Sequence, residues 1–295
     1  MRDYWLTQYL LAAVGWTYIV VCLVAIALAL WLPKTKRSKA VSGAIVLALA
    51  SILPIQGFQE YRVAKTAADD YKVRLAKAQA LFDERCKTAG EKIYKTVDNV
   101  EGVLMEKMRP KEINLSDQYR LDDPFGSDCH GEECITDLLR VTNGSEHNLE
   151  LAARLKNGFS YVDVIDPTDG QRYRYRAVIG ADTSHRLTLN RITSNAQPAP
   201  FSITWDDIST REDRDNWIAG GVLKVIDKKS GEIIGERRGY MMDQGQGNQD
   251  GGRSPWAFAY NNACPKLPTV SDGRAIRVGH SRKFILSILQ SQEGK

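Results

Sequence analysis

The distribution of charged side chains divides the chain into an apolar N-terminal part and a longer mixed part. No charged residue occurs at positions 4–33, and none occurs at positions 40–59. Each run reaches the length of about 20 residues at which an α-helix crosses the hydrocarbon core of a bilayer. The sequence therefore predicts a transmembrane α-hairpin, and we assign residues 1–58 as a two-helix membrane anchor.

The next segment, residues 59–90, has the spacing of an amphipathic helix. Its apolar side chains recur at alternating intervals of three and four residues, at Tyr61, Ala64, Ala68, Tyr71, Leu75, Ala78 and Phe82. Such a stripe either pairs with a neighbouring protomer as a stalk or packs on the domain that follows. Because coiled-coil seams favour Leu, Ile and Val over Ala, we expect it to pack on the chain's own domain.

Residues 91–295 are predicted to form one α+β domain with a mainly antiparallel sheet. Strand-like segments separated by short turns are typical of hairpins, and they occur at residues 161–165, 172–179, 186–193, 201–208, 217–226 and 233–242. Helical spacing predicts a short helix at 135–141. A second helix, which includes Ile285 and Ile288, would cover one face of the sheet.

Basic residues near the apolar runs indicate the orientation of the anchor. The loop between the runs carries Lys34, Lys36, Arg37 and Lys39. Short cytoplasmic loops are enriched in Lys and Arg. Basic residues also follow the second run and favour the opposite orientation, and the acids among them barely count in this rule, so the loop prevails by a modest margin. The first run is longer than the core of a signal peptide. We therefore expect a two-pass protein of a bacterial inner membrane with its soluble domain in the periplasm.

The number of cysteines supports the same placement. Cys22 lies inside the first apolar run, and the soluble part contains four more: Cys86, Cys129, Cys134 and Cys264. An even number suits disulfides in an oxidising compartment, with three possible pairings. We favour Cys129 with Cys134, which flank a short polar segment, and Cys86 with Cys264, which would join the start of the domain to its end. The alternative is that all four are reduced.

The charge of the soluble part argues against nucleic acid as a partner. The chain has 40 Lys and Arg and 36 Asp and Glu, and its first 58 residues contain five of the former and one of the latter. The remainder is formally neutral and lacks the positive field that drives non-specific binding to phosphate backbones. The expected partners are the lipid bilayer and either another protein or further copies of the chain.

The glycine-rich segment 245–253 has the most unusual local composition. Its backbone amides could approach an anion, and Arg253 could add a bidentate contact; the glycines concerned are Gly245, Gly247, Gly251 and Gly252. The spacing matches neither a dinucleotide-binding fingerprint nor a P-loop, so no cofactor is expected. The alternative, which we favour, is a mobile surface loop.

Three aromatic residues, Trp256, Phe258 and Tyr260, follow this segment at alternate positions. Their spacing predicts a strand with one aromatic face. Such a face either belongs to the core, which we favour, or stacks on a ligand held beside the glycine-rich segment. Trp256 is the aromatic candidate for ligand binding.

A second candidate site is the strand at 172–179, where Arg172, Arg174 and Arg176 alternate with tyrosines. Pleating places the three arginines on one face, where they would contact lipid headgroups, an acidic partner or an anionic polymer. The alternative, which we favour, is a charged solvent face that protects a strand from aggregation.

Signals for catalysis and metal binding are weaker. The spacing of Cys129, His130 and Cys134 is not a standard zinc pattern, so no metal site is predicted. Ser184 and His185 would point to opposite sides of a strand, which makes them a poor catalytic pair. No catalytic residue is assigned. An acidic cluster is interpreted as solvated turn residues rather than as a cation site: Asp206, Asp207, Asp213 and Asp215.

Four short segments carry a resemblance to other proteins. They are Glu-Arg-Cys-Lys at 84–87, Gly-Tyr-Met-Met-Asp at 239–243, Arg-Ser-Pro-Trp at 253–256 and Asn-Ala-Cys-Pro at 262–265. With them the chain resembles uncharacterised two-transmembrane proteobacterial inner-membrane proteins. The likeness covers most of the soluble part, and it implies no known activity.

These observations predict a membrane-anchored extracytoplasmic protein of the bacterial envelope that binds a ligand or a partner and is not an enzyme. One alternative is a cytoplasmic-facing sensor whose ligand clusters the membrane hairpin, as in membrane-acting defence effectors. The other is an envelope hydrolase, whose nucleophile and base would be brought together only by folding.

Overall fold

The structure is a computed structural model that describes residues 2–107, 109, 112, 114–120, 127–140, 158–179 and 187–291. The chain forms two compact units, Met1–Lys72 and Val73–Lys295.

The first unit contains helix α1 (Arg2–Trp31) and the N-terminal part of helix α2 (Lys36–Cys86). The Tyr18 hydroxyl donates to the carbonyl oxygen of Ala50 at 2.5 Å, and the Ser42 hydroxyl donates to that of Ala29 at 2.7 Å. Both helices are long and apolar enough to span a membrane by length and composition. The second apolar run and the heptad-patterned segment belong to one continuous helix, since α2 extends to Cys86.

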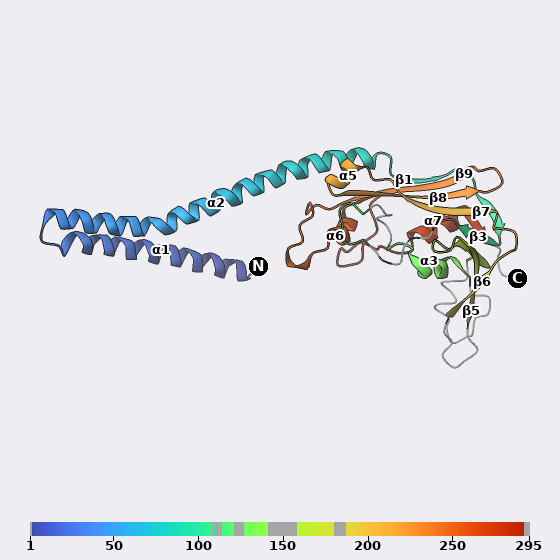
Figure 1. The fold of residues 1–295 in the computed structure, drawn as a ribbon, viewed down its shortest axis with the longest axis horizontal. Coiled ribbons are helices and arrows are strands. Elements are labelled where there is room, and N and C mark those ends of the chain that lie inside the picture. The colour runs from blue at the N-terminus through green and yellow to red at the C-terminus, as the bar shows by residue number, and fades with distance from the viewer. Residues whose placement is uncertain are drawn as a thin grey trace. The chain divides into compact units, whose positions relative to one another are not determined.

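The second unit is built on a nine-stranded sheet within the part of the chain that the structure describes (Figure 1). Its order is β1-β9-β8-β7-β3-β4-β5-β6, and β10 also pairs with β9. The strands are β1 (Gly90–Ile93), β3 (Gly102–Met105), β4 (Tyr161–Ile165), β5 (Arg172–Ile179), β6 (Leu187–Thr193), β7 (Phe201–Asp207), β8 (Ile218–Asp227), β9 (Ile233–Met242) and β10 (Ala263–Cys264). A separate parallel pair joins β2 (Val97–Val100) to β11 (Leu289–Ser291).

The sheet is mixed, which corrects the expectation of a mainly antiparallel sheet. Its central strand β3 pairs parallel with β4 on one side and with β7 on the other. Antiparallel pairs extend outward from this centre on both sides. The expectation was wrong because it considered only the short turns after residue 160. The connection from β3 to β4 passes through helix α3 (Gly131–Leu138), and parallel strands need a crossover of this kind.

Several predicted elements are confirmed. The β4–β5 hairpin and strand β9 have the predicted bounds, and β6, β7 and β8 differ by one residue at one or both ends. The helix predicted at 135–141 instead runs from Gly131 to Leu138, and its acidic residues Glu132 and Glu133 are favoured in a first helical turn.

Helices cover both faces of the sheet (Figure 1). On one face, α3 and α7 (His280–Ile288) bury side chains against strands β3, β4, β7 and β8, among them Ile135, Leu138, Phe284, Ile285 and Ile288. On the other face, the last turns of α2 pack through Ala78 and Phe82 against Ile218, Tyr240 and Met242. The C-terminal half of the heptad stripe therefore packs on its own unit, as expected.

The three aromatics after the glycine-rich segment do not form a strand. Residues Pro255–Ala259 form helix α6, and Tyr260–Asn262 form the short helix η3. Pro255 occupies the start of α6, where its fixed backbone angle suits a helix. Because Trp256 and Tyr260 are four residues apart, they share a buried helical face, whereas Phe258 is 52% exposed.

Candidate functional site

The glycine-rich segment folds around a carboxylate of the same chain. Asp243 is fully buried, and its two oxygens accept hydrogen bonds from the amides of Gly245 at 3.0 Å and Gly247 at 2.8 Å. Arg253 binds the same carboxylate with both terminal nitrogens, Nη1 at 3.0 Å. The carboxylate of Asp243 thus occupies the position that an external anion would take among these amides, and it holds the segment in place.

Gly247 is required by the packing around this carboxylate. Its φ of +81° is favourable only for glycine, and a Cβ there would collide with the indole of Trp217. Gly251 and Gly252 also have positive φ, in the short helix η2 (Asp250–Gly252). The ring of Trp217 lies 5.2 Å from that of Trp256, whose Nε1 donates to the carbonyl oxygen of Asp117 at 2.9 Å. Trp256 is therefore a core residue of this region.

Two of the three arginines on β5 neutralise a buried carboxylate. Asp163 is fully buried, and Arg174 donates to both of its oxygens, from Nε at 2.7 Å and from Nη2 at 2.9 Å. Arg172 lies 3.4 Å from the same carboxylate. The hydrogen bond to Asp163 raises the pKa of Arg174, so Arg174 stays protonated and positively charged. Arg176 is exposed, so the predicted positive stripe is confined to one side chain.

Asp166, in the β4–β5 turn, is expected to make stability depend on pH. Hydrogen bonds from Thr168, from its hydroxyl at 2.6 Å and its amide at 2.9 Å, lower the pKa of the Asp166 carboxyl, and Arg191 adds to this. The ionised form therefore stabilises the fold above the unfolded pKa of about 3.9, and this contribution is lost as the pH falls through the lower folded pKa.

We expect Asp166→Asn to be less stable than the parent chain near pH 6, and we expect this difference to shrink at about pH 2, because the contribution of the ionised carboxylate is lost as the pH falls. Chemical denaturation at both pH values measures the difference. Asp98→Asn, the same change at an exposed position, is the control for the loss of one negative charge. A destabilisation by Asp166→Asn that stays the same at both pH values would contradict the argument.

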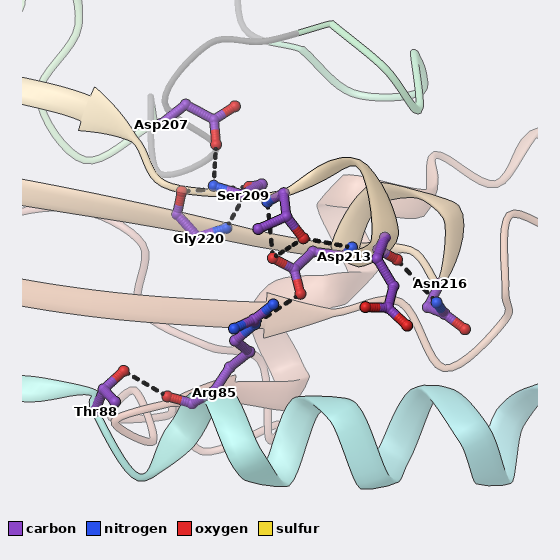
Figure 2. A network of polar contacts seen from close by, with 9 residues as sticks. Arg85, Thr88, Asp207, Ser209, Asp213, Asn216 and Gly220 are labelled. Atoms are coloured by element: carbon purple, nitrogen blue, oxygen red, sulfur yellow. Dashed lines mark hydrogen bonds and ion pairs between the residues drawn. The ribbon is translucent and has the colours of Figure 1, made fainter.

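The acidic residues at 206–215 take part in ion pairs. Asp206 and Asp207 contact basic residues of neighbouring elements, namely Lys107, Lys224 and Arg214. Asp213 caps helix α5 (Arg211–Asp215) together with Thr210, and it accepts a hydrogen bond from Arg85 at 2.8 Å. Figure 2 shows how this contact joins the end of α2 to α5. The carboxylates thus serve structural contacts.

The four cysteines of the second unit lie in the two predicted pairs. Cys86 and Cys264 are at disulfide distance, with their Cα atoms 5.6 Å apart, and so are Cys129 and Cys134, with Cα atoms 4.3 Å apart. Cys22 in α1 is a free thiol. The first pair joins the C-terminal end of α2 to strand β10.

A cavity of about 170 Å³ lies between strands β8 and β9 and the segment that follows β10. Gly221 and Gly239 are opposite each other in the sheet and line the cavity, so no side chain fills this part of the sheet face. Leu223 and Arg237 form the next pair on the same face of the sheet. The opposite wall consists of Cys264, Pro265, Lys266, Leu267 and Pro268. The Cys86–Cys264 pair therefore ties one cavity wall to α2.

The residues that line this cavity carry more positive than negative charge. Their only carboxylate among the described residues is Glu91, and their cations are Arg109, Arg237, Arg238 and Lys266. The guanidinium of Arg238 pairs with Glu236 and that of Arg237 with Asp128. Even with these two carboxylates counted, the positive charges outnumber the negative ones.

Asp128 fixes Arg237 and the start of α7. It is 2% exposed and accepts hydrogen bonds from Nη2 of Arg237 at 2.8 Å, from the amides of His280 at 3.0 Å and Ser281 at 2.9 Å, and from the Ser281 hydroxyl at 2.8 Å. The other terminal nitrogen of Arg237, Nη1, is buried and has no hydrogen-bond partner among the described residues. The Arg237 side chain as a whole is 13% exposed, so atoms other than Nη1 form its contribution to the cavity lining.

Sequence reasoning missed these cavity residues. The available signal was the adjacent pair Arg237 and Arg238 in the middle of a strand whose ends are apolar. Arg109 and Lys266 gave no signal, since only folding brings them to β9. Ser184 and His185 lie outside the described residues. Of the other histidines, the Nε2 atom of His280 lies 2.9 Å from the carbonyl oxygen of Ile276, and Nδ1 of His130 lies 3.4 Å from Glu133.

Comparisons with known proteins give no match: no family model, no curated protein and no solved structure corresponds significantly to the chain. The candidate site therefore rests on the geometry of the chain itself. The resemblance to two-transmembrane proteobacterial proteins stays a prediction.

Proposed function

We propose that the chain is a membrane-anchored binding protein of the bacterial envelope, with the cavity beside β9 as its binding site. In this proposal, α1 and the N-terminal part of α2 form a hairpin across the inner membrane. The second unit lies in the periplasm, and the loop around Lys36 lies in the cytoplasm. The positive charges of that loop support this orientation.

The observation that carries the proposal is the Cys86–Cys264 pair. Disulfides persist in oxidising compartments, which supports a periplasmic position for the unit that contains this pair. The same pair fastens a wall of the cavity to the helix that continues into the anchor. A concave site with apolar walls and a few polar groups is the usual form of a small-molecule binding site.

Two alternative functions differ from this proposal, one in the cellular compartment of the second unit and the other in its chemistry. A cytoplasmic sensor would use the same cavity with reduced cysteines. An envelope hydrolase would need a nucleophile beside a general base, and its candidates Ser184 and His185 lie outside the described residues.

Labelling of introduced cysteines in cells tests the orientation. Ser230→Cys lies in the exposed turn between β8 and β9, and Ser38→Cys lies at the start of α2, also exposed. Both are conservative replacements of a hydroxyl by a thiol. Spheroplasts with an intact inner membrane are treated with a membrane-impermeant maleimide, and the parent chain gives the background from Cys22.

We expect labelling of Ser230→Cys in intact spheroplasts and labelling of Ser38→Cys only after permeabilisation. The reverse pattern would place the second unit in the cytoplasm and overturn the proposal in favour of the sensor. Equal labelling of both variants would reject the hairpin.

A further inference from the structure

Resting on the proposed binding function, we propose that the cavity binds a small carboxylate with an apolar body. The carboxylate contacts Arg237 and Lys266, and the body lies against Leu223, Pro265 and Leu267. The binding is non-covalent.

The charge of the site selects an anion. Arg237 is held by Asp128 through Nη2, and its side chain, which is 13% exposed, lines the cavity opposite Lys266. Arginine presents paired N–H groups that match a carboxylate, and such charge-assisted hydrogen bonds are about twice as strong as neutral ones. Because Asp128 already neutralises part of the charge of Arg237, Arg237 and Lys266 together suit a monoanion better than a polyanion.

The arginine is positioned rather than free to move. Its partner Asp128 is itself held by hydrogen bonds from the first amides of α7. A second lining arginine, Arg109, is also held in place, because its guanidinium lies 5.1 Å from the ring centroid of Trp205. A binding group held in advance loses little conformational entropy when the ligand enters. The site is thus built around Arg237, with Lys266 as an exposed second cation on the opposite wall.

The size and lining of the cavity select the body of the ligand. A volume of about 170 Å³ is close to that of an apolar protein cavity of about 150 Å³ that holds benzene. The apolar lining residues are Leu223, Pro265, Leu267 and Pro268. The glycine pair Gly221 and Gly239 gives a flat floor on which a ring or a branched aliphatic group can lie.

Three probes separate the contribution of the ligand's carboxylate from that of its apolar body: benzoate, its neutral analogue benzamide, and acetate. Isothermal titration calorimetry is carried out on the full chain in lipid nanodiscs, with empty nanodiscs as the blank. We expect benzoate to bind at least tenfold more tightly than either benzamide or acetate, because a charged hydrogen bond and apolar burial each contribute a factor of about ten.

Two variants locate the binding. Arg237→Met should weaken benzoate binding at least tenfold, because it removes the guanidinium that lines the cavity while Asp128 keeps its three hydrogen bonds from α7. Lys266→Met, at an exposed position that does not threaten folding, should weaken it about threefold. Lys229→Met, in the exposed β8–β9 turn, is the matched control and should bind benzoate like the parent chain.

The proposal is overturned if benzoate does not bind, if benzamide or acetate binds equally well, or if Lys266→Met and Lys229→Met bind benzoate with the same affinity. These outcomes concern the purified chain and leave the cellular labelling experiment unaffected. A periplasmic unit that does not bind benzoate would therefore reject the ligand class alone. Benzoate binding by a unit that faces the cytoplasm would reject the proposed location alone.

Discussion

Asp243→Asn is expected to lower the free energy of unfolding by about 3 to 5 kcal/mol, the usual effect of breaking a buried ion pair from one side. The carboxylate of Asp243 is fully buried and accepts hydrogen bonds from Gly245, Gly247 and Arg253. An asparagine keeps the shape, but one of the two acceptor oxygens becomes an NH2 donor, and the negative charge that pairs with Arg253 is removed. The whole segment 245–253 should lose its anchoring as a result.

The matched control is Asp250→Asn, the same change at an exposed position of the same segment. Surface substitutions of this kind usually alter stability by less than about 0.5 kcal/mol. Both variants are compared with the parent by chemical denaturation of the full chain in detergent. A loss for Asp243→Asn no larger than that for Asp250→Asn would contradict the role of the carboxylate as the centre of the segment.

Replacement of both Cys86 and Cys264 by Ser is expected to cost up to about 5 kcal/mol, because the cross-link closes a long loop and restricts the unfolded chain. The two residues are 178 positions apart in the sequence. Removing the link also detaches the cavity wall at Cys264 from the end of α2, where Arg85 and Asp213 remain as a polar contact (Figure 2).

The comparison for this variant is the double replacement of Cys129 and Cys134, which are five positions apart. The same chain-entropy argument gives about 2 kcal/mol for so short a loop. Denaturation of the parent in the presence of reductant should reproduce the sum of the two losses. If the long-range pair contributes no more than the short-range pair, restriction of the unfolded chain does not explain its effect.

Local patterns in the sequence were sufficient for the elements that depend on neighbouring residues. The hairpin of β4 and β5 follows from alternating side chains around a Pro- and Gly-containing turn, and its bounds were predicted. The pairing of Cys86 with Cys264 followed from parity and position in the chain. Long apolar runs likewise predicted α1 and the first part of α2.

The features that sequence reasoning missed depend on contacts between distant segments. The parallel centre of the sheet arises because β3 lies between β4 and β7, an arrangement that no local pattern encodes. The alternate aromatics at Trp256 and Phe258 suggested a strand, but Pro255 and the burial of Trp256 favour a helix. Arg253 suggested an external anion, because the position of Asp243 beneath the glycines is visible only in the folded chain.

The cavity is also a product of tertiary structure. Arg237 belongs to β9, Lys266 follows β10, and the Asp128 that orients Arg237 precedes α3. A single sequence gives no reason to combine these three residues. Their positions relative to one another are set by the cross-link at Cys264 and by the start of α7.

The most direct test of the central claim, that the second unit is an extracytoplasmic binding domain, is a count of free thiols in living cells. Cells are treated with a membrane-permeant alkylating agent, and the pairs are mapped by mass spectrometry. The account predicts that Cys86 is joined to Cys264 and Cys129 to Cys134, with Cys22 as the alkylated residue. Alkylation of all four cysteines of the second unit would contradict it and favour a cytoplasmic sensor.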